Sequence, residues 1–163
     1  MLQATKDQII EELRVHRDRI CTCLSLMDDA DVWRDVNAHV VSIGNTVLHL
    51  VGNLSQQVLA GLGGQDYKRE RSAEFTDKPD ADGAELQRRL TETVDKAMAV
   101  IADMDADMMT RTYTIQGSET TGIGAVIHVV THFTYHAGQI AFAVKAAKDI
   151  DVGFYKGVDL EKD

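Results

Sequence analysis

The chain has 163 residues, a length that fits one domain with a sizeable buried core. Hydrophobic residues make up 44% and charged residues 26%, which is typical of a soluble globular protein and excludes a disordered chain. The formal net charge of -9 would repel a phosphate backbone, so it argues against nucleic acid as a general partner.

The apolar runs are short and interrupted by charged residues, so we expect no membrane-spanning segment and no membrane partner. The first residues, MLQATKDQIIEEL, lack the basic start and the apolar core of a signal peptide. We therefore expect a cytoplasmic protein that forms a single domain over residues 1–163.

A single proline, Pro79, interrupts the chain, and residues that favour helices, such as Ala, Leu, Glu, Gln and Lys, are abundant. The first predicted helix spans about residues 5–27, where apolar side chains recur every three or four positions. Thr5 and Gln8 have the spacing of a capping box, which predicts that this helix begins at Thr5.

Two cysteines, Cys21 and Cys23, fall within the first predicted helix. At this spacing their side chains point away from each other, and no further ligand at metal-binding spacing lies nearby in the sequence. We interpret both as packing residues or partly exposed thiols.

The second predicted helix spans about residues 42–62 and contains two internal glycines, Gly44 and Gly52. An internal glycine weakens a helix, so its presence indicates the close approach of another backbone or side chain. A polar connection follows, with the sequence GGQDYKRERSAEFTDKPDADG.

The third and fourth predicted helices span about residues 82–104 and 121–147. Between them, residues 112–115 alternate Thr with Tyr or Ile, which predicts a short extended piece too small to form a sheet of its own. Four long helices joined by loops predict an all-α protein with the architecture of a four-helix bundle.

Three histidines, His128, His132 and His136, follow one another at intervals of four residues in the last predicted helix, in the stretch HVVTHFTYHAGQI. Side chains four apart on a helix lie on one face about one turn apart, so two such imidazoles can bind one metal ion. Side chains eight apart lie roughly 12 Å apart along the axis, which is too far for a shared ion. The spacing therefore predicts a metal pair that includes His132 and one of the other two histidines.

A third ligand has to come from a facing helix. His49 is the strongest candidate, because it falls in the middle of the second predicted helix among apolar residues. His16 competes with it, but a lone histidine on an apolar stripe is more often a hydrogen-bonded core residue. His39 falls in a predicted loop and has no helical register with the others.

The segments NTVLHLVGNL and HVVTHFTYHAGQI resemble the two motif segments of the DinB-like (YfiT-like) superfamily of metal-dependent proteins. The likeness covers most of the chain, and its most specific part is a His-xxx-His followed by Gly-Gln. It implies a DinB-like four-helix bundle that binds a divalent metal, nickel or zinc, through His49, His132 and His136. His128 matches a position that is not a ligand, and Tyr135 stands where many relatives have a further histidine.

Several members of this superfamily transfer a low-molecular-weight thiol such as bacillithiol, mycothiol or glutathione, so the resemblance implies a thiol S-transferase. Three neutral imidazoles leave a bound ion its full charge and an open position, where a thiol would lose its proton. A metal-dependent hydrolase and a non-catalytic, metal-stabilised ligand-binding or interaction bundle are the alternatives. We also expect a homodimer that binds a small-molecule ligand or thiol.

Polar residues near the predicted ligands are candidates for orienting them or a bound water. Asn45 and Asn53 lie one turn before and one turn after His49, and Gln139 follows the last histidine by three residues. Asp35 is a weaker candidate from the preceding loop. An ordinary packing or exposed role is the alternative for each.

The connection at residues 67–75 carries three basic side chains, Lys68, Arg69 and Arg71. They are candidates for contacting anionic groups of a thiol cofactor. A solvated charged loop is the alternative interpretation, because exposed charges often contribute little.

Overall fold

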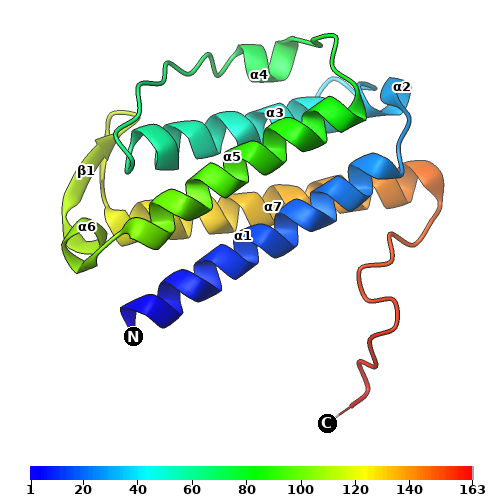
Figure 1. Cartoon of the computed structure of the whole chain (residues 1–163). Helices are drawn as coiled ribbons and strands as arrows, with labels where there is room; N and C mark the ends of the chain where they lie inside the picture. The colour runs from blue at the N-terminus through cyan, green and yellow to red at the C-terminus, as the bar shows by residue number, and fades with distance from the viewer. Residues whose placement is uncertain (163) are drawn as a thin grey trace.

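The computed structural model describes residues 1–162 and consists mainly of helices (Figure 1). The long elements are α1 (Leu2–Ser25), α3 (Ile43–Leu54), α5 (Gly83–Asp103) and α7 (Gly122–Lys148). A π-helical turn, η1 (Ser55–Ala60), continues α3. The connections contain the short helices α2 (Asp29–Val32), α4 (Ala73–Thr76) and α6 (Ala106–Thr110) and the strands β1 (Thr112–Ile115) and β2 (Ser118–Thr121). The predicted all-α helical bundle is confirmed.

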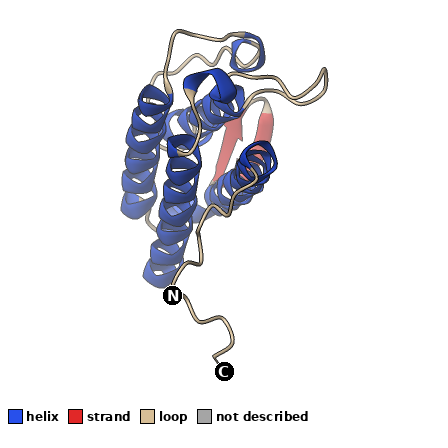
Figure 2. Ribbon diagram, turned by 90° about the vertical axis from the view of Figure 1, so that its right-hand side faces the viewer, coloured by secondary structure: helices blue, strands red, loops and turns tan. Residues whose placement is uncertain are grey.

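The four long helices lie side by side, so that α1 and α3 each pack against α5 and α7. Figure 2 shows the bundle turned by 90°, seen from the end at which α1 stops, with the two strands at the far end of the helices. The connection between α3 and α5 carries α4 back along the whole length of the bundle, so α5 runs in the same direction as α3 (Figure 1). This return lays α4 against α3, which has consequences for the site described below.

Three of the four long helices begin at a side-chain cap. Ser42, Asp82 and Thr121 each accept a hydrogen bond from the backbone N–H three residues later, at the starts of α3, α5 and α7. These caps explain why the last three predicted helices begin within one residue of the observed ones.

The first helix differs from the prediction at its start. It begins at Leu2, and Met1 precedes it without a side-chain cap. Thr5 donates its hydroxyl to the carbonyl of Met1, and Gln8 donates to Glu12, so the predicted capping box is wrong. The physical reason is that Leu2 packs against the hydrophobic core, which extends the helix by one turn.

The predicted extended piece is one half of a β hairpin. Strands β1 and β2 pair in antiparallel register, with Ile115 opposite Ser118. Gln116 and Gly117 connect them with positive φ angles of 53° and 75°, as the tightest hairpin turns require. The expectation that this piece forms no sheet is wrong, because the paired strand follows at once and the hairpin packs beside α7.

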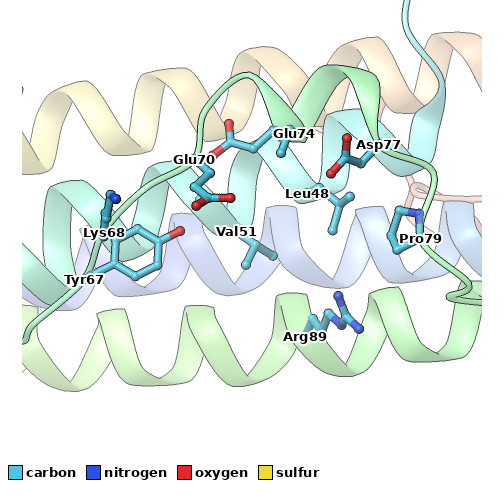
Figure 3. Close-up of a pocket in the computed structure, with 11 residues that line it drawn as sticks. Leu48, Val51, Tyr67, Lys68, Glu70, Glu74, Asp77, Pro79 and Arg89 are labelled. Atoms are coloured by element: carbon cyan, nitrogen blue, oxygen red, sulfur yellow. The ribbon is translucent and has the colours of Figure 1, made fainter.

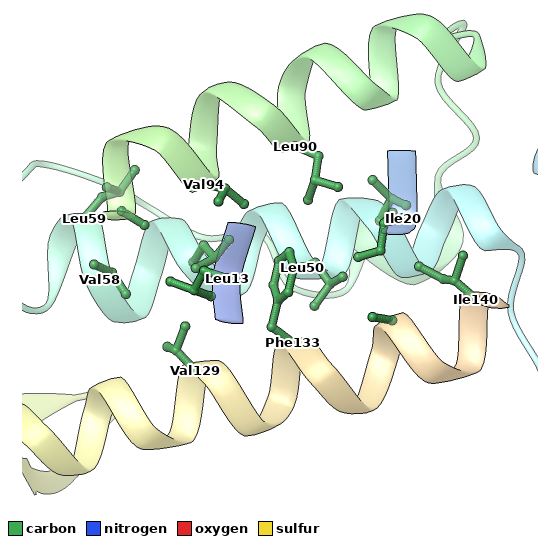
Figure 4. Packing of buried hydrophobic residues seen from close by; sticks show 14 of the residues in the cluster. Leu13, Ile20, Leu50, Val58, Leu59, Leu90, Val94, Val129, Phe133 and Ile140 are labelled. Atoms are coloured by element: carbon green, nitrogen blue, oxygen red, sulfur yellow. The ribbon is translucent and has the colours of Figure 1, made fainter. Parts of the chain in front are cut away.

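The core lies between the four long helices and consists of aliphatic side chains around one large aromatic ring, that of Phe133 (Figure 4). Cys23 is buried in it and Cys21 is half-buried, in line with their predicted packing roles. Burial raises the pKa of the Cys23 thiol to about 11. Within residues 1–162, none of the helices is long and apolar enough to cross a membrane. The single-domain organisation over residues 1–163 stays a prediction.

Candidate metal centre

Three histidine side chains meet between α3 and α7. The Nε2 atom of His49 lies 3.1 Å from Nε2 of His132, which lies 3.2 Å from Nε2 of His136. His49 is buried, and the two histidines of α7 are half-buried. The cluster therefore has one side fixed in the bundle and another that opens toward the surface.

The nitrogen positions fit a shared cation. Ring nitrogens that each lie about 2.1 Å from one ion can be at most about 4.2 Å apart. The two Nε2 pairs that involve His132, at 3.1 and 3.2 Å, lie inside this limit. The ligand atoms of all three histidines lie within 4.8 Å of one another. A single Nε2–H on His132 is unable to point at both neighbours at once, so hydrogen bonds within the cluster do not satisfy all three nitrogens.

The environment keeps the three rings neutral, which is the form that binds a metal. Burial lowers the pKa of His132 to about 3, assisted by the neighbouring His136 and His49. Burial also lowers the pKa values of His49 and His136. Among the described residues, no Cys or carboxylate ligand joins the cluster.

A carboxylate fixes the far side of His49. Oε2 of Glu74, in α4, lies 2.9 Å from Nδ1 of His49, and both side chains are buried. A carboxylate only accepts hydrogen bonds, so Nδ1 carries the proton and donates it, and the lone pair remains on Nε2. This carboxylate–histidine pair is the arrangement that orients metal-binding imidazoles in proteins.

Arg69 completes this arrangement. Its guanidinium lies 2.5 and 2.7 Å from the two carboxylate oxygens of Glu74, and its side chain is 3% exposed. The same group lies 3.2 Å from Nδ1 of His49. A guanidinium group only donates hydrogen bonds, so it cannot bond to an Nδ1 atom that already carries a proton. The shorter distances to the carboxylate make Glu74 the main partner of Arg69.

Gly52 makes room for the buried pair. A Cβ atom at this position would lie 1.9 Å from Oε1 of Glu74 and 3.1 Å from Nε of Arg69. Similarly, a Cβ atom at Gly44 would lie 2.6 Å from the ring of Trp33. The prediction that these internal glycines mark close approaches is confirmed.

The remaining histidines lie outside the cluster. His128 lies one turn before His132 on α7, and their rings stack with centroids 5.7 Å apart. His16 is buried in α1 with its Nε2 3.6 Å from a carboxylate oxygen of Glu12. His39 is exposed in the loop before α3. The sequence left two α7 pairings open, and the geometry favours the pair of His132 and His136.

The predicted orienting residues have mostly other roles. Asn45 is buried and donates to the carbonyls of Glu74 and Asp77, so it anchors the connection that carries α4 and touches no ligand. Asp35 is exposed and pairs with Lys78 at 2.5 Å. For both residues the structure shows the alternative, an ordinary packing or exposed role, because their partners are groups of the returning connection.

The two other amides differ. Asn53 is buried, but within residues 1–162 it forms no hydrogen bond with a clustered histidine. Gln139 donates to the hydroxyl of Tyr135 at 3.0 Å. It also lies close enough to His136 to oppose the lowering of that residue's pKa by burial and by His49.

Among the basic residues of the connection, Arg69 faces the bundle, and Arg71 lies over the ring of Phe75, which in turn packs on His49. Lys68 is exposed. Glu74 was missed by the sequence reasoning, because nothing in its local pattern distinguishes it from a solvated charge. The usable signal was Gly52, which indicated that a side chain crosses the helix one turn beyond His49.

A pocket of about 370 Å³, here called the loop pocket, lies between α3, α5 and the connection at residues 67–79 (Figure 3). Leu48 and Val51 contribute apolar surface. Its charged lining has both signs: Lys68, Glu70, Glu74, Asp77 and Arg89. Glu74 contacts the Nδ1 side of His49, so the loop pocket lies behind that ring and away from the Nε2 atoms.

Fold and site together define a DinB-like helical bundle with a three-histidine cluster. Among solved structures, the chain is similar to a DinB-like protein from Bacillus cereus, at 11% identity over 86% of this chain and 91% of that chain, with a TM-score of 0.68. It is also similar to the DinB-like protein YjoA from Bacillus subtilis, at 14% identity over 88% and 94% of the two chains, with a TM-score of 0.67. These likenesses confirm the predicted DinB-like fold.

Residues 3–155 match the family model DUF1572, which is described as a protein of unknown function, and the chain belongs to this family. No curated protein sequence matches the chain.

Proposed function

We propose that this protein binds a divalent metal ion, nickel or zinc, through Nε2 of His49, His132 and His136, and that it acts as a low-molecular-weight-thiol S-transferase. The observation that carries the proposal is the convergence of three neutral imidazole nitrogens in one small space. The contact between Glu74 and Nδ1 of His49 adds support, because it directs the lone pair of that ring toward the cluster.

The donor set favours a functional ion over a structural one. Structural zinc generally has four protein ligands, whereas catalytic sites have three and an open position. An ion bound here would supply a Lewis acid that lowers the pKa of a coordinated thiol or water. The chain's own part is to hold the rings neutral and to present half-buried His132 and His136 at the surface.

Alanine substitutions test the ligand set. His49→Ala, His132→Ala and His136→Ala should each remove most of the bound metal, because two remaining imidazoles chelate an ion poorly. His128→Ala is the matched control and should retain it. The measurement is metal content after purification without a histidine tag. Metal loss in His128→Ala together with retention in His136→Ala would refute the proposed pair.

Cobalt substitution tests the open position. Thiolate binding to Co²⁺ should produce a sulfur-to-metal charge-transfer band, and the apparent pKa of the thiol should fall below its free value of about 8.5. A cobalt site that binds neither thiols nor azide, with unchanged spectra throughout, would refute the transferase proposal. The non-catalytic, metal-stabilised bundle would then be the remaining alternative.

The homodimer expected from the sequence stays a prediction. Its support in this chain is limited to apolar side chains that α7 exposes, among them Ile127 and Phe142, which are 54% and 75% exposed. An interface between two copies would cover surface of this kind.

A further inference from the structure

A second pocket, here called the hairpin pocket, lies between the β hairpin and the start of α7 and has a volume of about 350 Å³. Ile115 and Ala125, both buried, give it an apolar floor. Its walls carry uncharged hydrogen-bonding groups, namely two side-chain amides and two hydroxyls: Gln57, Gln116, Ser118 and Thr120. Among the described residues, no Lys, Arg, Asp or Glu lines it.

This pocket adjoins the three-histidine cluster. His128 forms part of its wall, and the same ring stacks on His132. A molecule in the pocket would therefore lie one helical turn from a metal ligand. The loop pocket, in contrast, reaches the site only through Glu74, on the side of His49 that faces away from the cluster.

Hydrogen bonds connect the pocket wall with the cluster. Gln57 donates to Gln116 at 2.9 Å, Gln116 donates to Gln56, and Gln56 accepts from Arg69 at 3.1 Å. Arg69 in turn donates to Glu74, which accepts the hydrogen bond from Nδ1 of His49. This series of hydrogen bonds holds the side-chain amides in fixed positions. The pocket therefore presents oriented donors and acceptors rather than freely rotating side chains.

The charges around the hairpin pocket disfavour an anionic ligand. The hydrogen bonds between the glutamine side chains end at the cation of Arg69, and the buried carboxylate of Glu74 already neutralises that cation. The chain as a whole has a formal net charge of -9. A carboxylate in the pocket would lose water without a Lys or Arg side chain in the wall to pair with it, which costs free energy, whereas an amide or hydroxyl group would find matching partners in the wall.

We infer that the hairpin pocket binds the non-reacting part of the substrate, and that this part is uncharged and carries amide or hydroxyl groups. The inference rests on the proposed function for the identity of the reacting group, a thiol. The pocket itself supplies the rest of the recognition. It assigns His128 to contact with the substrate and leaves the basic residues of the connection without a part in binding it.

Two probes of nearly the same shape and opposite character, one neutral and one anionic, test this inference. N-acetylcysteinamide is neutral, and N-acetylcysteine carries a carboxylate in place of the carboxamide. Their affinities for the cobalt-loaded protein are measured from the charge-transfer band across a range of concentrations. The neutral probe should bind more tightly, and tighter binding of the acid would overturn the inference.

A pair of lysine substitutions isolates the pocket from overall charge and thiol acidity. Thr120→Lys adds a cation to the pocket wall, and Thr114→Lys adds one to the same hairpin in a strand position that does not line it. Thr120→Lys should shift the preference toward the acid by roughly threefold to fivefold relative to Thr114→Lys, the size expected for a partly exposed charge pair. Equal preferences in the two variants would overturn the inference.

The S-methyl forms of both probes separate this inference from the proposed function. Blocking the thiol weakens coordination and leaves the recognition groups unchanged. NMR titration of the metal-free protein should show the same preference for the neutral form and the same response to Thr120→Lys. Absence of metal binding would refute the proposed function alone, while loss of this preference would refute the pocket assignment alone.

Discussion

At the scale of single residues, the site depends on one buried contact that joins a charged connection to a helix. His49 is the only clustered histidine within residues 1–162 whose Nδ1 atom has a protein partner. The Nδ1 atoms of His132 and His136 are buried and form no hydrogen bond with a described residue. Orientation of the cluster by the protein therefore depends mainly on Glu74 and, through it, on Arg69.

Glu74→Gln should lower the affinity for metal by about tenfold to a hundredfold, the usual effect of losing a hydrogen-bonding partner of a ligand. Glutamine retains the length and an acceptor for Arg69, but it loses the charge that fixes the proton on Nδ1 of His49. The measurement is competition with a chromophoric chelator, well below the melting temperature of each variant. Glu70→Gln, an exposed change in the same connection, is the control. Equal affinities in the two variants would show that Glu74 has no orienting role.

At the scale of elements, the site is built where a long connection returns along α3. Side chains of α4 reach over that helix because Gly52 leaves space for them. One residue after the end of α3, η1 widens the helix by a π turn, a feature often found at functional sites. The turn carries Gln56, which bonds with Arg69, and Gln57, which lines the hairpin pocket.

Gly52→Ala and Gly138→Ala form a matched pair that tests the close approach. A methyl group at Gly52 would overlap Glu74, whereas one at Gly138 would meet nothing within 4 Å. Gly52→Ala should lose about 1–3 kcal/mol of unfolding free energy, as overpacking does, and should also lower metal affinity. Gly138→Ala lies in an exposed helix interior and should gain about 0.5–1 kcal/mol. Chemical denaturation of the metal-free proteins measures both, and a gain in Gly52→Ala would contradict the packing argument.

At the scale of the whole molecule, the periodicity of apolar residues was enough to predict the bundle. Ser42, Asp82 and Thr121 cap the observed helices because such side chains satisfy free backbone N–H groups wherever a helix begins. Histidine spacing predicted that the last long helix, α7, carries two of the three clustered residues. The contacts of Glu74 and Arg69 escaped prediction, because they depend on the path of the connection at residues 63–82, and no periodicity constrains that path.

The pH response of the whole chain follows from the buried rings. In the folded protein, burial holds the pKa of His132 at about 3, below its ordinary value of 6.5. The pKa values of His49 and His136 are lowered as well. Below the ordinary value, the unfolded chain therefore binds more protons than the folded chain. Its unfolding free energy then decreases as the pH falls, and the stabilisation present above pH 6.5 is lost progressively toward about pH 3.

His132→Gln tests this linkage in the metal-free protein. Without the ring, the dependence of the unfolding free energy on pH should become shallower by up to about one proton between pH 6 and pH 4, because one group that resists protonation has been removed. Denaturant titrations at several pH values measure the slope for both proteins. Parallel curves would show that His132 titrates alike in the folded and unfolded states.

For the metal-loaded wild type, the same neutral rings predict that the ion is retained at pH 6 and lost only at lower pH, where protons begin to compete for Nε2.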